Sequence, residues 1–331
     1  MRNQILAILI FLTILTFSCQ TKKFLVVSYN VENLFDTVKN SPVDKDFLPD
    51  GPLKWNTEKY QKKLDDLSKV LSSIDSKHLP DFVGLVEIEH RWVVEDLAQT
   101  GKLKKQNYSI AHFEGPDPRG IEVAFLYSPR FKLFQQQAIK VFTDSTQRYR
   151  SRDILYVKGL LQTDTLYFFI NHWKSRRGGE EATEKNRLAA AIKLRSVTDS
   201  ILNYNQQAKI IIMGDFNDTP ADSSLNFILG AGKPGEQTKL VNITYPLHDG
   251  GLGSHYFRNE YSMIDNFVIS NPLLISKRGI YTDGKANIFS PEWISYKTKS
   301  GHWAPSRTYS GEKYYGGFSD HYPIYFYLYR K

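Results

Sequence analysis

Cysteine is almost absent from the sequence: Cys19 is the only one among 331 residues. A lone cysteine excludes an intrachain disulfide and a cysteine-ligated structural zinc site. The chain also lacks internal repeats, low-complexity tracts and Gly/Ser linkers. Past residue 17, no apolar run is long enough to span a bilayer.

Hydrophobic residues make up 41% of the chain and aromatic residues 14%, which is enough to bury a sizeable core. This length suits two average domains or one large α/β sandwich or barrel. The formal net charge is +8, spread along the chain. Such an excess favours an anionic partner: nucleic acid, a phosphate ester or an anionic lipid surface.

The first residues have the pattern of a targeting segment. An apolar stretch from Ile5 to Phe17 has the length of a signal h-region, and Ser18-Cys19 follows it directly. This is similar to a bacterial lipoprotein signal, although Thr16 stands where such signals usually carry Leu; the alternative is an ordinary secretory signal. We therefore expect a lipoprotein signal peptide over 1–18, lipidation of Cys19 and a short tether over 19–23. A single catalytic domain would span 24–331, anchored in the bacterial cell envelope or otherwise secreted, with the lipidated N-terminus as its only membrane contact.

Runs rich in β-branched and aromatic residues predict strands, and two helical periodicities predict helices. The helices are expected from Thr57 to about Ser76 and from about Glu181 to Asn203. Segment 281–318 is expected to be irregular. The predicted strands are Phe24–Ser28, Phe82–Glu87, Ile121–Tyr127, Ile154–Leu161, Leu166–Asn171, Ile210–Met213, Phe267–Ile269 and Ile324–Leu328. Many strands with few helices indicate a layered sandwich with the helices outside.

Polar side chains recur where these strands begin or end. In Ile211-Ile-Met-Gly-Asp-Phe-Asn217, alternation places Asp215 and Asn217 on one face of the strand end. Turn chemistry alone explains one such end but not six, and functional groups held by a rigid sheet are typical of an enzyme site. The other polar ends carry Asn30, Glu87 with Glu89, Asn171-His172, Asp265-Asn266 and Ser319-Asp320-His321.

These residue types indicate a reaction class. Oxygen ligands without cysteine suit Mg²⁺ or Mn²⁺. Imidazoles, amides and a hard cation are what phosphoester hydrolysis needs: charge neutralisation on the phosphate, a directed water, and donors for the charge that builds on phosphorus.

In chain order, Asn30, Glu87, His172, Asp215-x-Asn217, Asp265 and Ser-Asp320-His321 resemble the motifs of the endonuclease/exonuclease/phosphatase superfamily. The resemblance extends from Phe24 to about Leu328. It implies the deoxyribonuclease I-like fold: an α+β, four-layer α/β/β/α sandwich of two packed mixed sheets flanked by helices.

The resemblance also implies roles. Asn30, Glu87 and Asp320 would bind the metal, Mg²⁺ or Mn²⁺. Asp265 would orient His321, and either His321 or Asp215 would be the general base. Asn217 would position the nucleophile and the phosphate, and His172 would donate to the phosphate or assist the leaving oxygen.

Cations near these motifs are candidate phosphate contacts. Arg119 precedes a strand similar to one that brings an arginine to substrate in the family, and Lys174 and Arg176 follow His172. Arg152 belongs to an alternating arginine stripe, and Arg307 lies before His321. The alternative for each is a solvated surface cation.

Departures from the family motifs disfavour two of its subgroups, the abasic-site endonucleases and the inositol polyphosphate 5-phosphatases. Val86 replaces the Gln usual in abasic-site endonucleases, and Met263-Ile264 replaces their Trp-Arg. No cysteine lies near Asp265, unlike in inositol polyphosphate 5-phosphatases. Segments 171–179 and 307–321 resemble those of exported bacterial nuclease-like members of the family. We expect an exported, metal-dependent nuclease that acts on DNA or RNA and has no obligate protein partner. One alternative is a phosphatase or a sphingomyelinase-like phosphodiesterase of the same fold. The other is a non-catalytic envelope binding protein.

Overall fold

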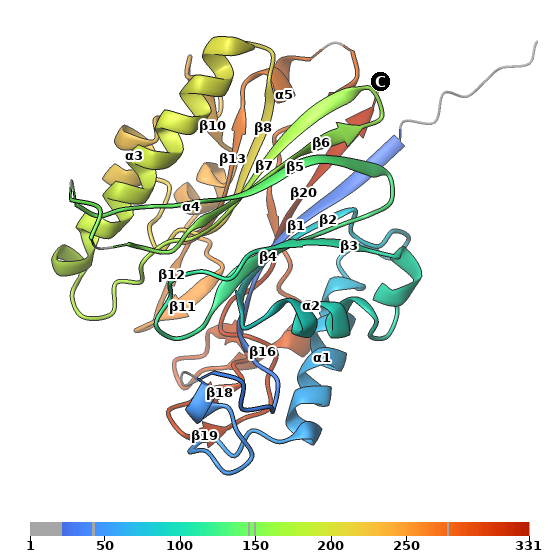
Figure 1. Ribbon diagram of the computed structural model, residues 1–331, viewed down its shortest axis with the longest axis vertical. Coiled ribbons are helices and arrows are strands. Elements are labelled where there is room, and N and C mark those ends of the chain that lie inside the picture. Colours follow the sequence, from blue (N-terminus) through green and yellow to red (C-terminus); the bar gives the residue numbers. More distant parts are fainter. Residues whose placement is uncertain (1–21, 42–43, 145, 149, 277, 331) are drawn as a thin grey trace, which may run out of the picture.

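The computed structural model describes residues 22–330 except 42–43, 145, 149 and 277. Two seven-stranded sheets lie face to face at its centre, with helices on their outer sides (Figure 1). The first sheet, sheet A, has the order β14 (Ile280–Tyr281), β20 (Ile324–Arg330), β1 (Lys22–Leu34), β2 (Phe82–Ile88), β4 (Glu122–Tyr127) and β3 (Ser109–His112), with β15 (Asn287–Ile288) also paired to β20. The second, sheet B, has the order β5 (Phe131–Ile139), β6 (Ile154–Leu161), β7 (Asp164–His172), β8 (Lys209–Asp215), β13 (Asp265–Ser270), β10 (Leu240–Asn242) and β9 (Ala231–Gly232).

Both sheets are mixed, because β1–β2 and β7–β8 pair in parallel while most other neighbours are antiparallel. Their facing sides form an apolar core that includes Phe82, Phe168 and Phe326. The sheets approach so closely that a Cβ on Gly84 would lie 2.8 Å from the Met213 side chain of the opposite sheet. Burial of strand residues on both faces explains their near-continuous apolar runs.

Helices cover the outer faces of both sheets (Figure 1). Helices α1 (Thr57–Leu71) and α2 (Arg91–Ala98) bury Leu64, Leu67 and Leu97 against sheet A. Helix α3 (Glu180–Tyr204) buries Ala190 and Leu194 against sheet B. The layers are therefore α/β/β/α, which confirms the predicted α+β sandwich.

Two expectations about local structure differ from what is observed. The first helix ends at Leu71, not near Ser76, because the hydroxyls of Ser72 and Ser73 donate back to Lys69 O and a turn follows. Segment 281–318 holds 3₁₀ helix η4 (Glu292–Ile294) and two small hairpins, β16 (Ser295–Lys297) with β17 (Trp303–Pro305) and β18 (Tyr309–Ser310) with β19 (Lys313–Tyr314). Contacts with residues that are distant in the sequence, described below, fix the position of this segment.

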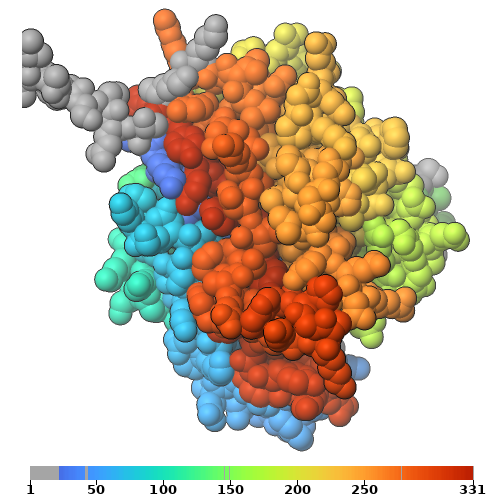
Figure 2. All heavy atoms as spheres, turned by 180° about the vertical axis from the view of Figure 1, so that it is seen from behind, coloured from blue at the N-terminus to red at the C-terminus, as the bar shows by residue number. Residues whose placement is uncertain are grey.

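Short elements complete the described chain: η1 (Asp44–Asp46), η2 (Leu103–Gln106), η3 (Ser224–Ile228), α4 (Tyr245–Asp249), α5 (Pro272–Ile275), and the hairpin β11 (His255–Phe257)–β12 (Glu260–Ser262). Figure 2 shows residues near 300–318 packed beside residues near 50–70, although some 250 positions separate them. Within the described ranges no helix is both long and apolar enough to cross a bilayer. The predicted signal peptide and the lipidated Cys19 lie outside the described residues.

Candidate active site

The predicted catalytic residues come from both sheets and meet at one end of the sandwich. Asn30 Nδ2 donates to Asp215 Oδ2 over 3.1 Å, although 185 positions separate the two residues. The Nε2 atom of His172 lies 3.7 Å from Glu87 Oε1 and 3.9 Å from Asp215 Oδ2. His321 Nε2 also lies 3.9 Å from Asp215 Oδ2. Asp215 is therefore the centre of a cluster that joins β1, β2, β7, β8 and the segment before β20.

Strand register explains how β7 and β8 present His172 and Asp215 side by side. The strands are parallel, with Asn171 opposite Gly214 and His172 opposite Asp215. Gly214 has a φ of 135°, and a Cβ there would lie 1.9 Å from Asn171 O, so only glycine fits. The glycine before Asp215 is thus required by the close approach of the two strand ends.

Glu87 leaves its strand through a backbone distortion. Its φ is 66°, and the register of β2 with β4 shifts between Val86 and Ile88. Positive φ is costly for a non-glycine residue and persists where the surroundings enforce it. The distortion turns the Glu87 carboxylate towards His172 and Arg119, with Arg119 Nη2 3.4 Å from Glu87 Oε1.

Asp265 and His321 form a buried pair. His321 Nδ1 lies 2.6 Å from Asp265 Oδ2, which also accepts a 2.6 Å hydrogen bond from Ser254 Oγ. Burial alone would lower the pKa of His321, but Asp265, assisted by Asp215 and Asp320, raises it well above the usual range. The structure therefore favours a positively charged His321 whose Nε2–H faces Asp215.

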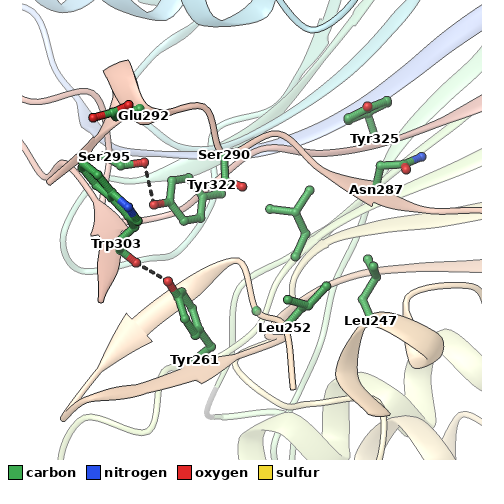
Figure 3. A pocket seen from close by; sticks show the side chains of 12 residues that line it. Leu247, Leu252, Tyr261, Asn287, Ser290, Glu292, Ser295, Trp303, Tyr322 and Tyr325 are labelled. Carbon is green, nitrogen blue, oxygen red and sulfur yellow. Dashed lines mark hydrogen bonds between the residues drawn. The ribbon is translucent and has the colours of Figure 1, made fainter. Parts of the chain in front are cut away.

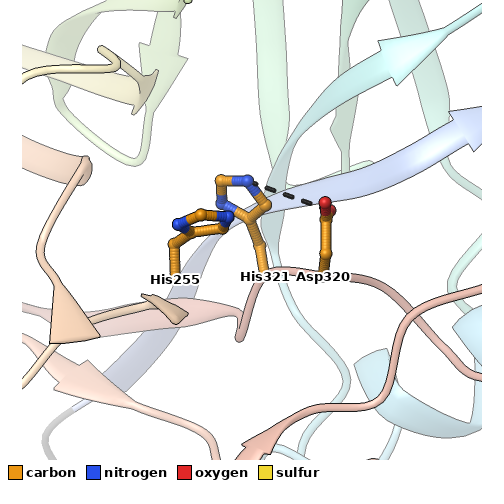
Figure 4. A group of neighbouring side chains, drawn as sticks. All are labelled: His255, Asp320 and His321. Carbon is orange, nitrogen blue, oxygen red and sulfur yellow. Dashed lines mark ion pairs between the residues drawn. The ribbon is translucent and has the colours of Figure 1, made fainter. Parts of the chain in front are cut away.

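A second imidazole, His255, lies against His321 with ring centroids 4.9 Å apart, and Asp320 lies on the other side of His321 (Figure 4). Burial, together with the charge of His321, lowers the pKa of His255 to about 4. Asp320 Oδ1 lies 3.9 Å from His321 Nε2. The two histidines therefore differ in charge at neutral pH: His255 is neutral and His321 is a cation.

The ionisation of His172 and Asp215 is set mainly by burial. Burial, with Arg152 and Arg119 contributing, lowers the pKa of His172 well below its usual range, so this imidazole is neutral. Burial, with Asp265 contributing, raises the pKa of Asp215 to about 7. Asp215 accepts hydrogen bonds from Asn30 Nδ2 and from the backbone N–H of Asn217.

The donor chemistry at this end of the sheets fits a hard divalent cation. Ligand atoms of Asp215, Asp265 and His321 lie within 4.8 Å of one another, as do those of His255, Asp320 and His321. Asp265 Oδ1 is buried with no hydrogen-bond partner in the described chain. Burial is the main cause of the raised pKa of Asp215, and the Asp265 and Glu87 carboxylates add to it. Asn30, Glu87 and Asp320 offer the amide and carboxylate oxygens that Mg²⁺ and Mn²⁺ prefer.

The five predicted substrate cations fall into two groups. Arg119 is half exposed beside Glu87, Arg307 Nη2 lies 3.1 Å from Asp320 Oδ2, and Lys174 has no ion pair in the described chain. Arg152 is buried, pairs with Asp117 and donates to Trp173 O over 2.7 Å. Arg176 donates to Asn217 O over 2.9 Å and pairs with acidic side chains. The contacts of Arg152 and Arg176 hold the loops of the site, and their direct contact with phosphate stays a prediction.

Two buried side chains fix the segment that precedes His321. Glu32 accepts hydrogen bonds from the backbone N–H groups of Thr308 and Tyr309, at 2.6 and 3.3 Å. Lys63 of α1 donates to Thr308 Oγ1 over 2.7 Å and to Phe318 O over 2.6 Å. Sequence reasoning missed Lys63 because a lysine on an amphipathic helix resembles a solvated one. For Glu32, the only indication of a role in the sequence is its position two residues after Asn30.

A cavity of about 340 Å³ lies next to the site. Its lining includes Glu32, Trp55, Arg177, Thr308 and Tyr309. The Trp55 and Tyr309 rings lie 6.0 Å apart. Trp55 is fully buried, so the half-buried Tyr309 ring and the exposed Arg177 guanidinium are the aromatic and cationic groups that a ligand in this cavity would contact.

Comparison with known proteins agrees with this geometry. The sequence model of the Endonuclease/Exonuclease/phosphatase family matches residues 25–330. Protein angel of Drosophila melanogaster is 22% identical over 268 residues, which cover 73% of this chain and 66% of that protein, slightly less than two thirds of its length. Truncated Caenorhabditis elegans TDP2 superposes with a TM-score of 0.56 at 16% identity, covering 93% of this chain and 98% of that one. D. rerio TDP2 complexed with single strand DNA product gives a TM-score of 0.54 at 18% identity, covering 92% and 98%. The family match confirms the resemblance seen in the motifs, and the chain therefore belongs to the Endonuclease/Exonuclease/phosphatase family of phosphoester-hydrolysing enzymes.

Proposed function

We propose that this enzyme is an exported, metal-dependent phosphodiesterase that hydrolyses nucleic acid. The observation that carries the proposal is the convergence of His172, Asp215 and His321 beside Glu87, with each His Nε2 lying 3.9 Å from Asp215 Oδ2. This spacing allows one phosphate oxygen or water to contact two of these side chains at once.

The charge states suggest how the groups divide the work. His321 is a cation and cannot accept a further proton, so Asp215 receives the proton of the attacking water, with Asn30 and Asn217 fixing its carboxylate. The His321 Nε2–H donates to a phosphate oxygen and stabilises the charge that builds there. His172, neutral and held at the end of β7, donates to the phosphate or to the leaving oxygen.

Enzymes of this family use a divalent metal, and Asn30, Glu87 and Asp320 are the residues that would hold it. Mg²⁺, or Mn²⁺ in its place, supplies positive charge at the phosphate oxygens and lowers the pKa of water.

Three observations support nucleic acid as the substrate. The formal net charge is +8, and Arg119, Lys174 and Arg307 lie around the site with exposed or half-buried side chains. The cavity beside Tyr309 and Arg177 suits a base next to the scissile phosphate. The structural similarity to D. rerio TDP2, which was solved with a single strand DNA product, agrees with this substrate class.

The test uses the soluble form lacking residues 1–19 with plasmid, RNA, bis-p-nitrophenyl phosphate, p-nitrophenyl phosphate and sphingomyelin, each with Mg²⁺ or EDTA. We expect cleavage of nucleic acid that EDTA stops and that His321→Ala lowers on the order of 10² to 10³-fold. Hydrolysis confined to monoester or lipid contradicts the nuclease. Absence of metal-dependent hydrolysis of every substrate contradicts the enzyme.

The proposal also places the enzyme in the cell envelope, on the evidence of the apolar stretch Ile5–Phe17 and the lone Cys19. Expression in a bacterial host with labelled palmitate tests this. We expect a labelled product in the membrane fraction, and an unlabelled precursor for Cys19→Ala. An unlabelled wild-type product in the soluble exported fraction supports the ordinary secretory signal.

One observation favours a phospholipid as the second candidate substrate. The hairpins β11–β12 and β16–β17 contact one another and expose Phe257, Tyr296 and Trp303, with 59, 46 and 41% of each residue accessible. Between them lies a cavity of about 530 Å³ lined by Leu247, Leu252 and aromatic residues (Figure 3). The cavity lining also includes Asn287, Glu292 and Ser295, and exposed aromatic side chains beside such a mixed lining are suited to a lipid surface with its polar headgroups. The sphingomyelin arm of the substrate panel decides between the two candidates.

A further inference from the structure

A second group of metal-ligating side chains lies outside the phosphoesterase site. Asp44 begins η1, and Glu89 and His90 join β2 to α2. One ligand atom of each of these three residues lies within 4.8 Å of the other two. Asn40 adds a fourth, because its Oδ1 lies 3.0 Å from His90 Nε2. We call these four residues the Asp44 cluster.

Two carboxylate oxygens in this cluster are buried without a partner. Asp44 and Glu89 are each 1% exposed. Asp44 Oδ2 accepts from the N–H groups of Asn40 and Ser41, and Glu89 Oε2 accepts from the N–H of Asp36. In the described part of the chain, Asp44 Oδ1 and Glu89 Oε1 have no hydrogen-bond partner. Burying two such oxygens beside one another is strongly disfavoured unless a cation or a shared proton lies between them.

The histidine presents a lone pair to the same point. His90 Nδ1 lies 3.1 Å from both carboxylate oxygens of Glu114, which places the ring proton on Nδ1. His90 Nε2 then faces two further acceptors, Asn40 Oδ1 at 3.0 Å and Glu89 Oε1 at 3.8 Å. The adjacent Arg91 does not neutralise them, because it binds Glu95 and the carbonyl of Ile110. Asn40, Asp44, Glu89 and His90 therefore direct four lone pairs towards one region, and without an ion the Asp44–Glu89 pair and the contact between His90 Nε2 and Asn40 Oδ1 each need a bridging proton.

We propose that Asn40, Asp44, Glu89 and His90 bind a divalent transition-metal ion, Zn²⁺ or Mn²⁺. One imidazole with three oxygens suits these ions, and a carboxylate that fixes the tautomer of a ligating histidine, as Glu114 does here, is the usual outer partner. The separations of His90 Nε2 from Asn40 Oδ1, 3.0 Å, and from Glu89 Oε1, 3.8 Å, lie on either side of the roughly 3.4 Å that tetrahedral bonds of about 2.1 Å give.

The ion has a structural role at this position. It joins the loop that follows β1 to the start of α2, two segments that share no strand pairing. None of its ligands is a ligand of the proposed catalytic ion. The inference therefore stands whether or not the proposed function is correct.

The test counts bound metal in the tag-free full-length chain in detergent. The Glu87→Gln background removes a ligand of the catalytic ion. In that background we expect one Zn²⁺ per chain to survive dialysis, and none after Asp44→Asn or Glu89→Gln. Asparagine at position 44 still accepts from Asn40 and Ser41, so the loop keeps its hydrogen bonds. Zn²⁺ raises the unfolding temperature of the Glu87→Gln protein by several degrees and leaves that of the double variants unchanged.

The matched control is Asp46→Asn, an exposed acid in the same 3₁₀ turn, which keeps the bound ion. Unchanged stoichiometry in Asp44→Asn overturns the proposal. A second result also overturns it: Asp44→Asn unfolds at a higher temperature than its Glu87→Gln parent in EDTA, while Zn²⁺ leaves the unfolding temperature of that parent unchanged. Such a result indicates that Asp44 and Glu89 share a proton in place of an ion. Binding of Ca²⁺ alone overturns the assignment to a transition metal. Should both variants misfold, anomalous scattering from Zn²⁺-soaked wild-type crystals gives the answer: a peak among the four ligands supports the site, and its absence overturns it.

Discussion

Asp265 makes a direct contact with His321, so its main effect on catalysis acts through the imidazole, although it also contributes to the raised pKa of Asp215. Its carboxylate lies 2.6 Å from His321 Nδ1 and helps to keep this histidine charged. The pair is comparable to other catalytic dyads in which a buried carboxylate fixes the orientation and the tautomer of a histidine.

We predict that Asp265→Asn lowers kcat by about 10² to 10³-fold, as His321→Ala does. The double variant should be no slower than His321→Ala alone, because Asp265 has nothing to orient once the imidazole is gone. Single-turnover rates on one nucleic-acid substrate measure this. Multiplicative losses in the double variant contradict it, since they require a separate role for Asp265.

A second prediction concerns Glu122, the first residue of β4. Burial, with Asp117 contributing, raises its pKa from 4.5 to about 8 in the folded protein. The protonated carboxyl is therefore the stable form in the fold, while the unfolded chain ionises near 4.5. The stability that this gives is fully present below pH 4.5 and is lost as the pH rises towards 8.

Glu122→Gln keeps the shape of the neutral carboxyl and removes its ionisation. We expect wild type and variant to have similar free energies of unfolding near pH 5. The variant should be more stable by at least about 1 kcal/mol at pH 8, because wild type then bears the cost of its buried charge. Urea denaturation at three pH values gives the comparison. Parallel pH curves for the two proteins contradict the prediction.

At the scale of elements, the segment from Thr308 to Phe318 depends on contacts with β1 and α1. Glu32 and Lys63 both bind Thr308, and Lys63 also binds Phe318 O, directly before the Ser319-Asp320-His321 motif. Burial, with Asp320 contributing, raises the pKa of Glu32 to about 7, and burial lowers the pKa of Lys63 to about 8. The charges of Glu32 and Lys63 partly compensate one another in a buried place.

Lys63→Met should destabilise the protein by about 3 kcal/mol, because it leaves Glu32 buried without a cation. Adding Glu32→Gln should restore part of that loss. The exposed neighbour Lys62, paired with Asp66, is the control, and Lys62→Met should cost under 1 kcal/mol. Chemical denaturation of the four proteins measures these effects. Equal losses for Lys62→Met and Lys63→Met contradict the structural role of Lys63.

The elements that sequence reasoning predicted are those with a strong local signal. Strand β8, with Ile210 to Met213 continuously apolar, and α3, with a long helical period, were both predicted. Helix α2 was missed, because its eight residues offer barely two turns of periodicity. Strand β5 was missed because it lies at the edge of sheet B and carries exposed glutamines in its middle.

Within the site, residue types could be predicted but partners could not. The motifs indicated Asp215, Asp265 and His321, because the chemistry needs those groups at strand ends. Arg152 was predicted to face phosphate, yet it is buried against Asp117, which lies 35 positions earlier. A sequence shows that a cation is present but not whether a distant acid already binds it. This is why buried ion pairs account for much of what the sequence left undecided.

At the scale of the whole molecule, the excess of positive charge should act over a distance on a polyanion. The formal net charge is +8, and Lys174 lies two residues after His172 with no ion pair in the described chain. A lysine that contacts phosphate releases a condensed counterion from nucleic acid, so log KM depends linearly on log salt concentration. Arg152 and Arg176 hold protein partners and should add little to this dependence.

We therefore expect Lys174→Gln to raise KM for a polynucleotide and to lower the magnitude of the salt slope by about 1. The effect on bis-p-nitrophenyl phosphate should be smaller, since that substrate has a single phosphate and no extended backbone. Lys193→Gln, an exposed lysine on α3, is the matched control and should leave the salt slope unchanged. Steady-state kinetics between 50 and about 200 mM salt give the slopes, the range over which such contacts are resolved. Identical salt slopes for Lys174→Gln and wild type would place Lys174 away from the nucleic acid. A salt slope near zero in the wild type would instead indicate a small or uncharged substrate.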